Sequence, residues 1–417
     1  MQTLSQISKV KVLLTKAFTF EILKFASLTR TNVNLCQSWE SEIIWLGNLT
    51  LLGSNSSNLF KRKTMKVDVY KLPQNSPDDL TALKAAIASG EINPKDIVAI
   101  LGKTEGNGCV NDFTRGFAVQ TLKNYLSNFV GQEQSESIVY VMSGGTEGVL
   151  SPHLTIFTSQ PSQPNMPTKM ALTLGVIHTR DFTSAEIGSL TMVKEVALAV
   201  NEAIASAGMA KADVHFVQIK CPLVTSRDRL LEDSHSMNKS VSSYQSMGYS
   251  RGASALGVAV ALDEVKLAAL SSEDICQNYA LYSTVASTSA GVELRNCEIL
   301  VLGNAPTSTS NFVIGHSVMQ NALDAQAVIK AIASTGQTSD RIVNIFVKAE
   351  ADPSGEILGR RHTMMDDSDI NHTRMARAVV AAVVASIVQD PMVYVSGGSE
   401  HQGPSGGGPV AVIARVD

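Results

Sequence analysis

The sequence of 417 residues is poor in aromatic residues, which make up 5% of it, and it contains no run of 18 or more apolar residues. A transmembrane helix needs such a run, so no membrane span is predicted. The hydrophobic content of 44% is nevertheless enough for a globular protein with an aliphatic core. The length allows two to four domains or one large composite.

An excess of positive charge is also missing. Lys and Arg number 34 against 38 Asp and Glu, which gives a net charge of −4. No dense basic patch occurs, so no nucleic-acid partner is expected. The five cysteines are odd in number and lack CxxC or Cys/His spacing. This pattern favours free thiols in a reducing compartment, and hence a cytoplasmic protein, over a disulfide framework or a zinc site.

The first 64 residues differ from the remainder of the chain. Their opening stretch carries several lysines before the first acidic residue, Glu21, so a mitochondrial targeting segment is one interpretation. Arginine is scarce there, however, and residues 41–54 do not resemble a targeting peptide. We therefore interpret residues 1–64 as an extension outside the folded core, and keep targeting as the alternative.

From Met65 onward one pattern of strand, helix and strand occurs three times. Residues 183–208 and 309–336 are similar to each other, and each follows a short apolar stretch, at 170–177 and 298–304. In all three copies the next strand ends on a lysine: Lys103, Lys220 and Lys348. The predicted β/α repeat units are 65–166, 167–296 and 297–417.

A later strand in each unit ends on a serine followed by small residues. The first and third units have Ser143-Gly144-Gly145 and Ser396-Gly397-Gly398. In the middle unit Ser289-Ala290-Gly291 matches best, with Ser250 as the alternative. Turns so poor in side chains let a substrate approach the backbone N–H groups. Lysine rarely ends a buried apolar strand unless it is paired or functional, so three such lysines indicate a site.

Lysine beside serine is a combination that can perform nucleophilic catalysis. The lysine acts as general base if burial or nearby cations lower its pKa. An arginine lies between the lysine and the serine turn of each unit: Arg115, Arg251 and Arg374. Three such sets predict a pocket with pseudo-threefold symmetry for a small, flat ring with three carbonyl-like oxygens. The chemistry expected there is hydrolytic opening of a cyclic amide or imide, with the oxyanion held by turn N–H groups.

Several long motifs resemble one known family. They include "GKTEGNGCVNDFTRGFA", "MSGGTEGVLSPH", "SMGYSRGASALG", "FVKAEADPSG" and "VYVSGGSEHQGPSGGGP". These motifs are similar to those of the cyanuric acid hydrolase/barbiturase family of ring-opening amidohydrolases, from Met65 to the C-terminus. The resemblance implies an α/β fold of three similar β/α units around a pseudo-threefold axis, a barrel-like composite with the active site on the axis.

The resemblance also implies roles for the repeated residues. In the family the middle unit supplies the nucleophile and its base, which correspond to Ser289 and Lys220. The outer pairs, Lys103/Ser143 and Lys348/Ser396, would then bind and polarise the other carbonyls. Further substrate contacts correspond to the three arginines and to Gly144, Ala290 and Gly397. Composition and pattern alone do not identify which of the three serines attacks.

A structural divalent cation, Mg²⁺ or Ca²⁺, is a further implication of the resemblance. One carboxylate and mainly main-chain oxygens would bind it, which suits a hard cation. The corresponding residues are Glu350, Ser399, Gln402, Gly403, Pro404 and Gly407.

The activity that the resemblance favours is opening of cyanurate to carboxybiuret, which loses CO₂ to give biuret, in a homotetramer. Two other functions stay open: a barbiturase that opens barbiturate to ureidomalonate, and a non-catalytic protein that binds a small ring. Cys109 and Cys221 lie near the predicted pocket lysines, but no histidine partner for a thiol nucleophile can be recognised.

Overall fold

Each of the three repeat units contains four main strands and the helices between them, and the third unit has two short strands in addition. The computed structural model describes residues 64–163, 169–231 and 242–416. The first unit contains β1 (Met65–Pro73), α3 (Thr81–Ala88), β2 (Ile97–Thr104), α4 (Phe113–Val130), α5 (Gln132–Ser137), β3 (Val139–Gly144) and β4 (His153–Pro161). The second contains β5 (Ala171–His178), α6 (Leu190–Ser206), β6 (Val214–Pro222), α7 (Ser226–Leu231), α8 (Ser243–Ala261), β7 (Ala286–Gly291) and β8 (Glu298–Ala305). The third contains β9 (Phe312–Met319), α9 (Ala325–Ser334), β10 (Ile342–Ala349), β11 (Glu356–Ile357), β12 (Arg360–Arg361), α10 (His372–Val388), β13 (Tyr394–Gly397) and β14 (Gly408–Arg415).

The four main strands of each unit form one sheet with the same topology. The sheet orders are β1-β4-β2-β3, β5-β8-β6-β7 and β9-β14-β10-β13, so the order is first, fourth, second, third in every unit. The second and third strands pair in parallel, as β2 does with β3, and the neighbours on the other side are antiparallel. This identity of topology confirms the prediction of three structurally similar β/α units.

The helix that crosses between the two parallel strands is α4, α8 or α10, because a parallel pair needs such a crossover. Each of these helices begins at a side-chain cap. The Asp112 carboxylate accepts from the N–H of Thr114, and the Asn371 side chain accepts from that of Thr373. Ser242 and Gln245 cap α8 reciprocally. The caps fix where the first turns of these helices lie, and the predicted arginines follow them.

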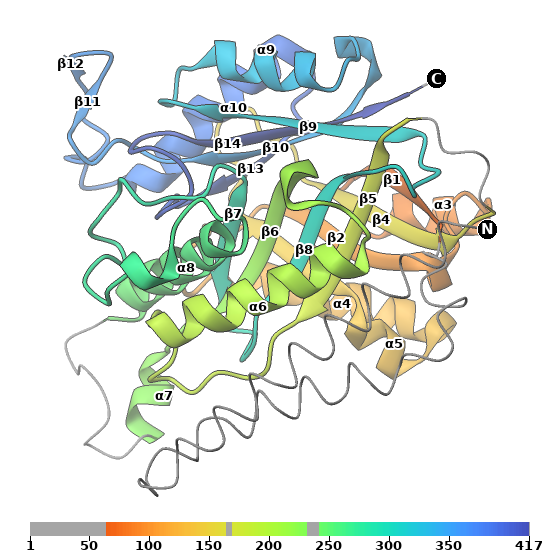
Figure 1. Ribbon diagram of the computed structural model, residues 1–417, viewed down its shortest axis with the longest axis horizontal. Helices are drawn as coiled ribbons and strands as arrows, with labels where there is room; N and C mark the ends of the chain where they lie inside the picture. Colours follow the sequence, from red (N-terminus) through yellow and green to blue (C-terminus); the bar gives the residue numbers. More distant parts are fainter. Residues whose placement is uncertain (1–63, 164–168, 232–241, 417) are drawn as a thin grey trace, which may run out of the picture. The chain divides into compact units, whose positions relative to one another are not determined.

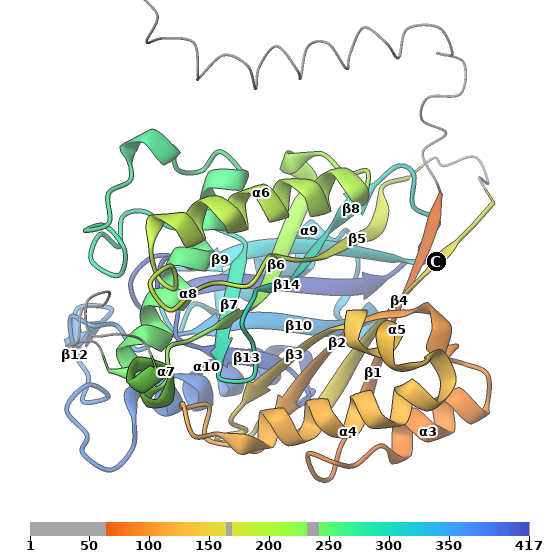
Figure 2. The same cartoon turned by 90° about the horizontal axis from the view of Figure 1, so that it is seen from below.

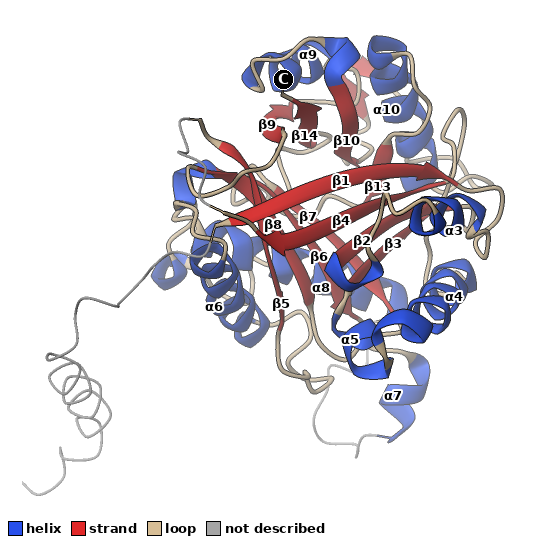
Figure 3. Cartoon of the chain, turned by 90° about the vertical axis from the view of Figure 1, so that its right-hand side faces the viewer, coloured by secondary structure: helices blue, strands red, loops and turns tan. Residues whose placement is uncertain are grey.

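The three sheets come together at the centre of the molecule (Figure 3). The hydrophobic core there contains residues of all three sheets. Phe346 of β10 is completely buried there. Its ring centroid lies 5.4 Å from that of Phe216, 5.6 Å from that of Tyr394 and 6.3 Å from that of Phe157. Residues from three units therefore meet around one aromatic side chain.

Each sheet also packs against the helices of its own unit, through one further hydrophobic core per unit. Figure 2 shows α3, α4 and α5 on one side of the sheets and α6 on the opposite side. Every sheet is therefore covered on both faces, which explains why strands such as β2 are apolar along almost their whole length. The described residues of 62–417 belong to one compact unit, so the repeats are not independent domains.

The prediction of a barrel-like composite is wrong in one respect. The main strands of the described residues form three separate four-stranded sheets, β11 and β12 form a small two-stranded one, and no closed barrel joins them. Side chains occupy the edge of β3 in place of a neighbouring strand. The Tyr140 N–H donates to Glu298 at 2.9 Å, and Lys220 Nζ donates to the Met142 carbonyl at 3.1 Å. These bonds satisfy edge groups of β3 without extending the ladder into the second unit.

The predicted boundary at 297 between the second and third units also needs correction. The apolar stretch 298–304 was expected to open the third unit, but it forms β8, which pairs with β5 and β6 of the second sheet (Figure 1). The strand before α9 is β9. Both strands are short and apolar, so local sequence does not distinguish the last strand of one unit from the first of the next.

The predicted extension, residues 1–64, lies almost entirely outside the described residues. None of the described helices is both long enough and apolar enough to cross a membrane.

Candidate active site

The register of the parallel strand pairs places one lysine beside one serine in every unit. Lys103 of β2 pairs with Ser143 of β3, and Lys348 of β10 pairs with Ser396 of β13. In the middle unit Lys220 of β6 pairs with Ser289 of β7. All three lysines are at most 1% exposed. The two strand-end residues that were predicted separately are therefore direct neighbours in each sheet.

The three serines border a single pocket to which all three units contribute. Gly144, Ala290 and Gly397, which follow the serines, line it as well. The small residues matter because large groups approach the turns closely. A Cβ atom on Gly397, for example, would lie 2.8 Å from Arg377 Nη1. The remaining lining residues are Gly108, Arg115, Met247, Arg251 and Arg377.

Ser250, the alternative serine of the middle unit, lies inside α8 and does not line this pocket. It is completely buried, and its hydroxyl donates to the Pro222 carbonyl at 2.5 Å. Ser289 instead lies 3.1 Å from Ser396, measured between their Oγ atoms. The structure therefore places Ser289, and not Ser250, with the other two serines.

The lysines of the outer units contact their own serines. Lys103 Nζ lies 3.2 Å from Ser143 Oγ, and Lys348 Nζ lies 3.1 Å from Ser396 Oγ. Burial, together with a nearby arginine, lowers the pKa of Lys103 well below its usual range and that of Lys348 to about 7. Amines in such surroundings exchange protons readily near neutral pH.

Lys220 of the middle unit has different partners. Its Nζ lies 3.1 Å from the Met142 carbonyl and 3.1 Å from Glu293 Oε1, and it makes no hydrogen bond with Ser289 within the described part of the chain. Burial lowers the pKa of Lys220, while the Glu293 carboxylate opposes that shift. The middle unit thus departs from the symmetry of the other two at its lysine.

The third pocket arginine is Arg377 and not Arg374, which is a correction to the prediction. Both lie on α10, one turn apart, but only Arg377 lines the pocket with the serines. Arg374 lines an adjoining cavity beside Asn107 and Tyr244. Arg374 was predicted because it lies between Lys348 and the serine turn of its unit, a condition that Arg377 also meets. Which face of α10 meets the pocket is decided by packing.

A glutamate four residues after each serine is a further part of the site that sequence reasoning missed. Arg377 Nε donates to Glu147 Oε2 at 2.7 Å, and Arg251 Nε donates to Glu400 Oε2 at 2.8 Å. Each pair joins two different units. Arginine lowers the pKa of both carboxyl groups against the effect of burial. The repeated strings "SGGTE", "SAGVE" and "SGGSE" were the available signal.

Neither cysteine near the site has the surroundings of a nucleophile. Cys221 is buried beside Lys220, and burial raises the pKa of its thiol. Its Sγ lies 3.5 Å from the Ser289 carbonyl, behind the strand and not in the pocket. Cys109 is partly exposed and lines the adjoining cavity. A thiolate mechanism therefore has no support in this geometry.

The loop that follows Ser396 contains the residues predicted to bind a cation. Glu350, the residue after β10, accepts from the Ser399 N–H at 3.1 Å, which joins the segment after β10 to this loop. The Gln402 side-chain carbonyl accepts from the Thr288 N–H at 2.7 Å, which joins the loop to β7 of the second unit. Gly403 and Gly406 have positive φ values of 124° and 72°, a conformation that favours glycine. No group of three or more His, Cys, Asp or Glu side chains able to hold a metal occurs among the described residues.

Comparison with known proteins gives a consistent result over this whole region. Residues 68–415 match the family model described as amidohydrolase ring-opening protein. The chain belongs to this family. A cyanuric acid amidohydrolase of Enterobacter cloacae is 53% identical over 370 residues, which cover 84% of this chain and all of the relative. A protein of the same name from Pseudomonas sp. strain ADP is 49% identical over 360 residues, 84% of this chain and 99% of the relative.

Solved structures agree with the family assignment. One structure of a cyanuric acid hydrolase has a TM-score of 0.81 and 48% sequence identity, and it matches 84% of this chain over its full length. A second, from A. caulinodans, has a TM-score of 0.80 and 46% identity, over 84% of this chain and 99% of its own. The family match therefore extends to the three-unit fold and to the region that contains the pocket.

Proposed function

We propose that the threefold pocket hydrolyses cyanurate, a flat cyclic ring with three equivalent carbonyl groups. The observation that carries the proposal is the convergence of three Lys–Ser pairs and three arginines on one pocket. Relatives about half identical in sequence bear the name cyanuric acid amidohydrolase, which supports the same substrate. Each unit binds one carbonyl through its serine turn and an arginine, so the ring is held and polarised on three sides.

In the proposed reaction Ser289 is the nucleophile and Lys220 its general base. Lys220 must first lose a proton to water and move from Glu293 to Ser289, its neighbour across the strand pair. Ser289 Oγ adds to a ring carbonyl and transfers its proton to Lys220. The ring C–N bond then breaks, and Lys220 returns the proton to the departing nitrogen. Water hydrolyses the resulting acyl-serine and releases carboxybiuret, which loses CO₂ to give biuret.

The assignment to the middle unit is supported by its departure from symmetry. In the outer units the lysine is already bonded to its serine, and the glutamate that follows this serine is bonded to an arginine of another unit. Side chains that are already paired in this way are suited to binding the substrate. Lys220 is the pocket lysine whose partner is a carboxylate, so its proton affinity is set differently. The Oγ atom of Ser289 lies close to the Ser396 hydroxyl, which can orient it toward a bound ring.

The substrate assignment is tested by assaying one preparation with both cyanurate and barbiturate. Production of biuret and CO₂ from cyanurate, with slower turnover of barbiturate, is expected. Faster turnover of barbiturate would assign a barbiturase, an outcome compatible with a 45% identical relative named cyclic amide hydrolase. Tight binding of either ring without turnover would instead support a non-catalytic binding protein.

Arg377→Ala should raise KM for cyanurate about tenfold or more, because a hydrogen bond to a charged donor contributes roughly 1.5–3 kcal/mol. Arg374→Ala, one turn away on the same helix, is the matched control and should change KM by less than about threefold. Steady-state kinetics of both variants, with melting curves to check folding, decide the point. A larger effect at Arg374 would restore the original prediction.

A structural Mg²⁺ or Ca²⁺ bound behind Ser396 is the second part of the proposal. The Glu350 carboxylate and main-chain oxygens of Ser399, Gln402, Gly403, Pro404 and Gly407 would hold it. These groups suit a hard cation because all the donors are oxygen. The ion would supply charge that braces the loop between Ser396 and β14. The proposed assembly is a cytoplasmic homotetramer, which sedimentation analysis can test.

Removing the cation with a chelator should lower the thermal midpoint on the order of 5 °C. An ion present at 100 times its Kd adds about 2.7 kcal/mol of stability, and each kcal/mol moves the midpoint of a large domain by about 2–4 °C. Glu350→Gln should start lower and lose little more on chelation. Identical melting of wild type with and without chelator, and after addition of Mg²⁺ or Ca²⁺, would contradict a bound ion.

A further inference from the structure

The three units contain equivalent glutamates that do not have equivalent partners. Glu147 pairs with Arg377 and Glu400 with Arg251, so a glutamate from one unit binds an arginine from another. If the three units were equivalent, Glu293 of the second unit would bind Arg115 of the first. It binds Lys220 instead. This is the place where the Arg–Glu pattern of the site departs from threefold symmetry.

The Nε of Arg115 is the donor that would bind Glu293 if the three units were equivalent. In the other two pairs the arginine Nε donates to the glutamate Oε2. Arg115 is 3% exposed, and its Nε has no hydrogen-bond acceptor in the described ranges; the nearest carboxylate oxygen, on Asp112, is 3.8 Å away. Its other nitrogens donate to the Ala290 carbonyl at 3.0 Å and to the Cys109 carbonyl at 2.7 Å.

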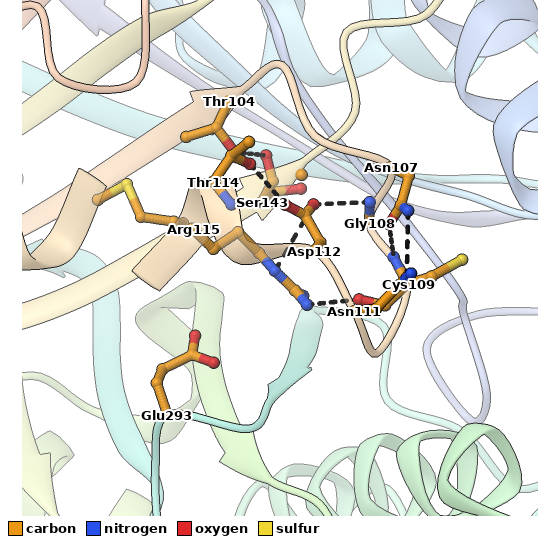
Figure 4. Close-up of polar contacts among 12 residues, drawn as sticks. Thr104, Asn107, Gly108, Cys109, Asn111, Asp112, Thr114, Arg115, Ser143 and Glu293 are labelled. Carbon is orange, nitrogen blue, oxygen red and sulfur yellow. Dashed lines mark hydrogen bonds and ion pairs between the residues drawn. The ribbon is translucent and has the colours of Figure 1, made fainter. Parts of the chain in front are cut away.

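Figure 4 shows Glu293 on the loop after β7, on the side of Arg115 away from Asp112, with no contact drawn between Glu293 and Arg115. Both groups still influence each other electrostatically. Burial works to raise the pKa of Glu293, but Lys220 and Arg115 outweigh it and keep the carboxyl group ionised. A buried donor without an acceptor costs free energy, so Arg115 Nε favours the arrival of a carboxylate.

We propose that Glu293 is a positioning residue that exchanges between Lys220 and Arg115. On Lys220 it holds the amine on the Met142 side, away from Ser289. On Arg115 it completes the third Arg–Glu pair and releases Lys220 to Ser289, the arrangement already present in the outer units. The proposal rests on Lys220 and Ser289 being the reacting pair of the proposed function.

The groups that face Lys220 set the direction of the expected pH effect. Glu293 on the loop after β7 and Cys221 on β6 favour its charged form, while Arg115 of α4 disfavours it. Glu298 of β8 is buried nearby, where burial raises its pKa to about 7, and Lys123 and Glu293 face it in turn. Glu293→Gln removes one anion without changing the shape of the side chain. The pKa of Lys220 therefore falls, and the amine is neutral down to a lower pH.

The test is the pH dependence of kcat/KM for cyanurate, which reports ionisation of the free enzyme. For Glu293→Gln the acidic limb should move down by about one pH unit, a tenfold gain in kcat/KM on that limb. Glu147→Gln, the matched variant in the first unit, should raise KM and leave the limb where it is. Ionisation of the substrate contributes equally to every variant.

A limb that stays in place in Glu293→Gln, or moves equally in Glu147→Gln, would overturn the proposal. Because Glu293→Gln can fail to fold, a crystal structure of the wild type with barbiturate bound is the second measurement. Glu293 on Arg115 Nε and Lys220 on Ser289 are expected there; Glu293 still on Lys220 would overturn the exchange. Wild type inactive on both rings would instead refute the proposed function.

Discussion

Replacing Ser289 with alanine is expected to lower kcat for cyanurate by a factor of about 10³ or more, since loss of a covalent nucleophile removes the main reaction path. Ser289 is the serine of the unit whose lysine is paired with a carboxylate, and its hydroxyl borders the common pocket. The hydroxyl removed is small, and the strand β7 keeps its pairing with β6. The fold should therefore be retained.

Ser250→Ala is the matched control for that variant. Ser250 is also a buried serine of the second unit, but its hydroxyl donates to a backbone carbonyl and lies outside the pocket. Its kcat should change less than about threefold, with a small loss of stability from the missing hydrogen bond. Steady-state assays and melting curves of the two variants are sufficient. An inactive Ser250→Ala beside an active Ser289→Ala would show that the attacking serine is the other one.

Phe346→Ala should lower the free energy of unfolding by about 3–5 kcal/mol, the range for removing a completely buried aromatic side chain. The ring contacts aromatic residues from all three units, so the space left behind cannot be filled by movement of one helix alone. Urea unfolding followed by circular dichroism measures the loss.

The control for this variant is Leu198→Ala on the outer face of α6, where the leucine is 68% exposed. It should change the free energy of unfolding by less than about 0.5 kcal/mol. A loss at Phe346 no larger than at Leu198 would contradict the shared central core. A selective loss of one unit's structure would show that the repeats unfold independently.

The lysines and serines of the pocket could be predicted from the sequence because the signal is local. Each lies at the end of an apolar strand, and the pattern occurs three times. Pairing in register was not visible in the sequence, yet it follows once β2 and β3 are parallel neighbours that end together. Ser289 could also be chosen from the sequence, because the residues around it resemble the other two serine turns more closely than those around Ser250 do.

Other features depend on contacts between distant segments and could not be predicted. Arg374 and Arg377 stand one turn apart on α10, and only packing of the third unit against the first decides that Arg377 meets Glu147. The apolar stretch that forms β8 looks like an opening strand until its pairing with β5 and β6 is known. Closure into a barrel was expected, but side chains such as Glu298 satisfy the edge of β3 instead.

The most direct test of the account is mass spectrometry of enzyme quenched in acid during turnover of cyanurate. An adduct equal in mass to one substrate molecule is expected on the peptide that contains Ser289, and it should be absent from Ser289→Ala. An adduct on the peptide of Ser143 or Ser396, or turnover by Ser289→Ala without any adduct, would contradict the assignment of the nucleophile to the middle unit.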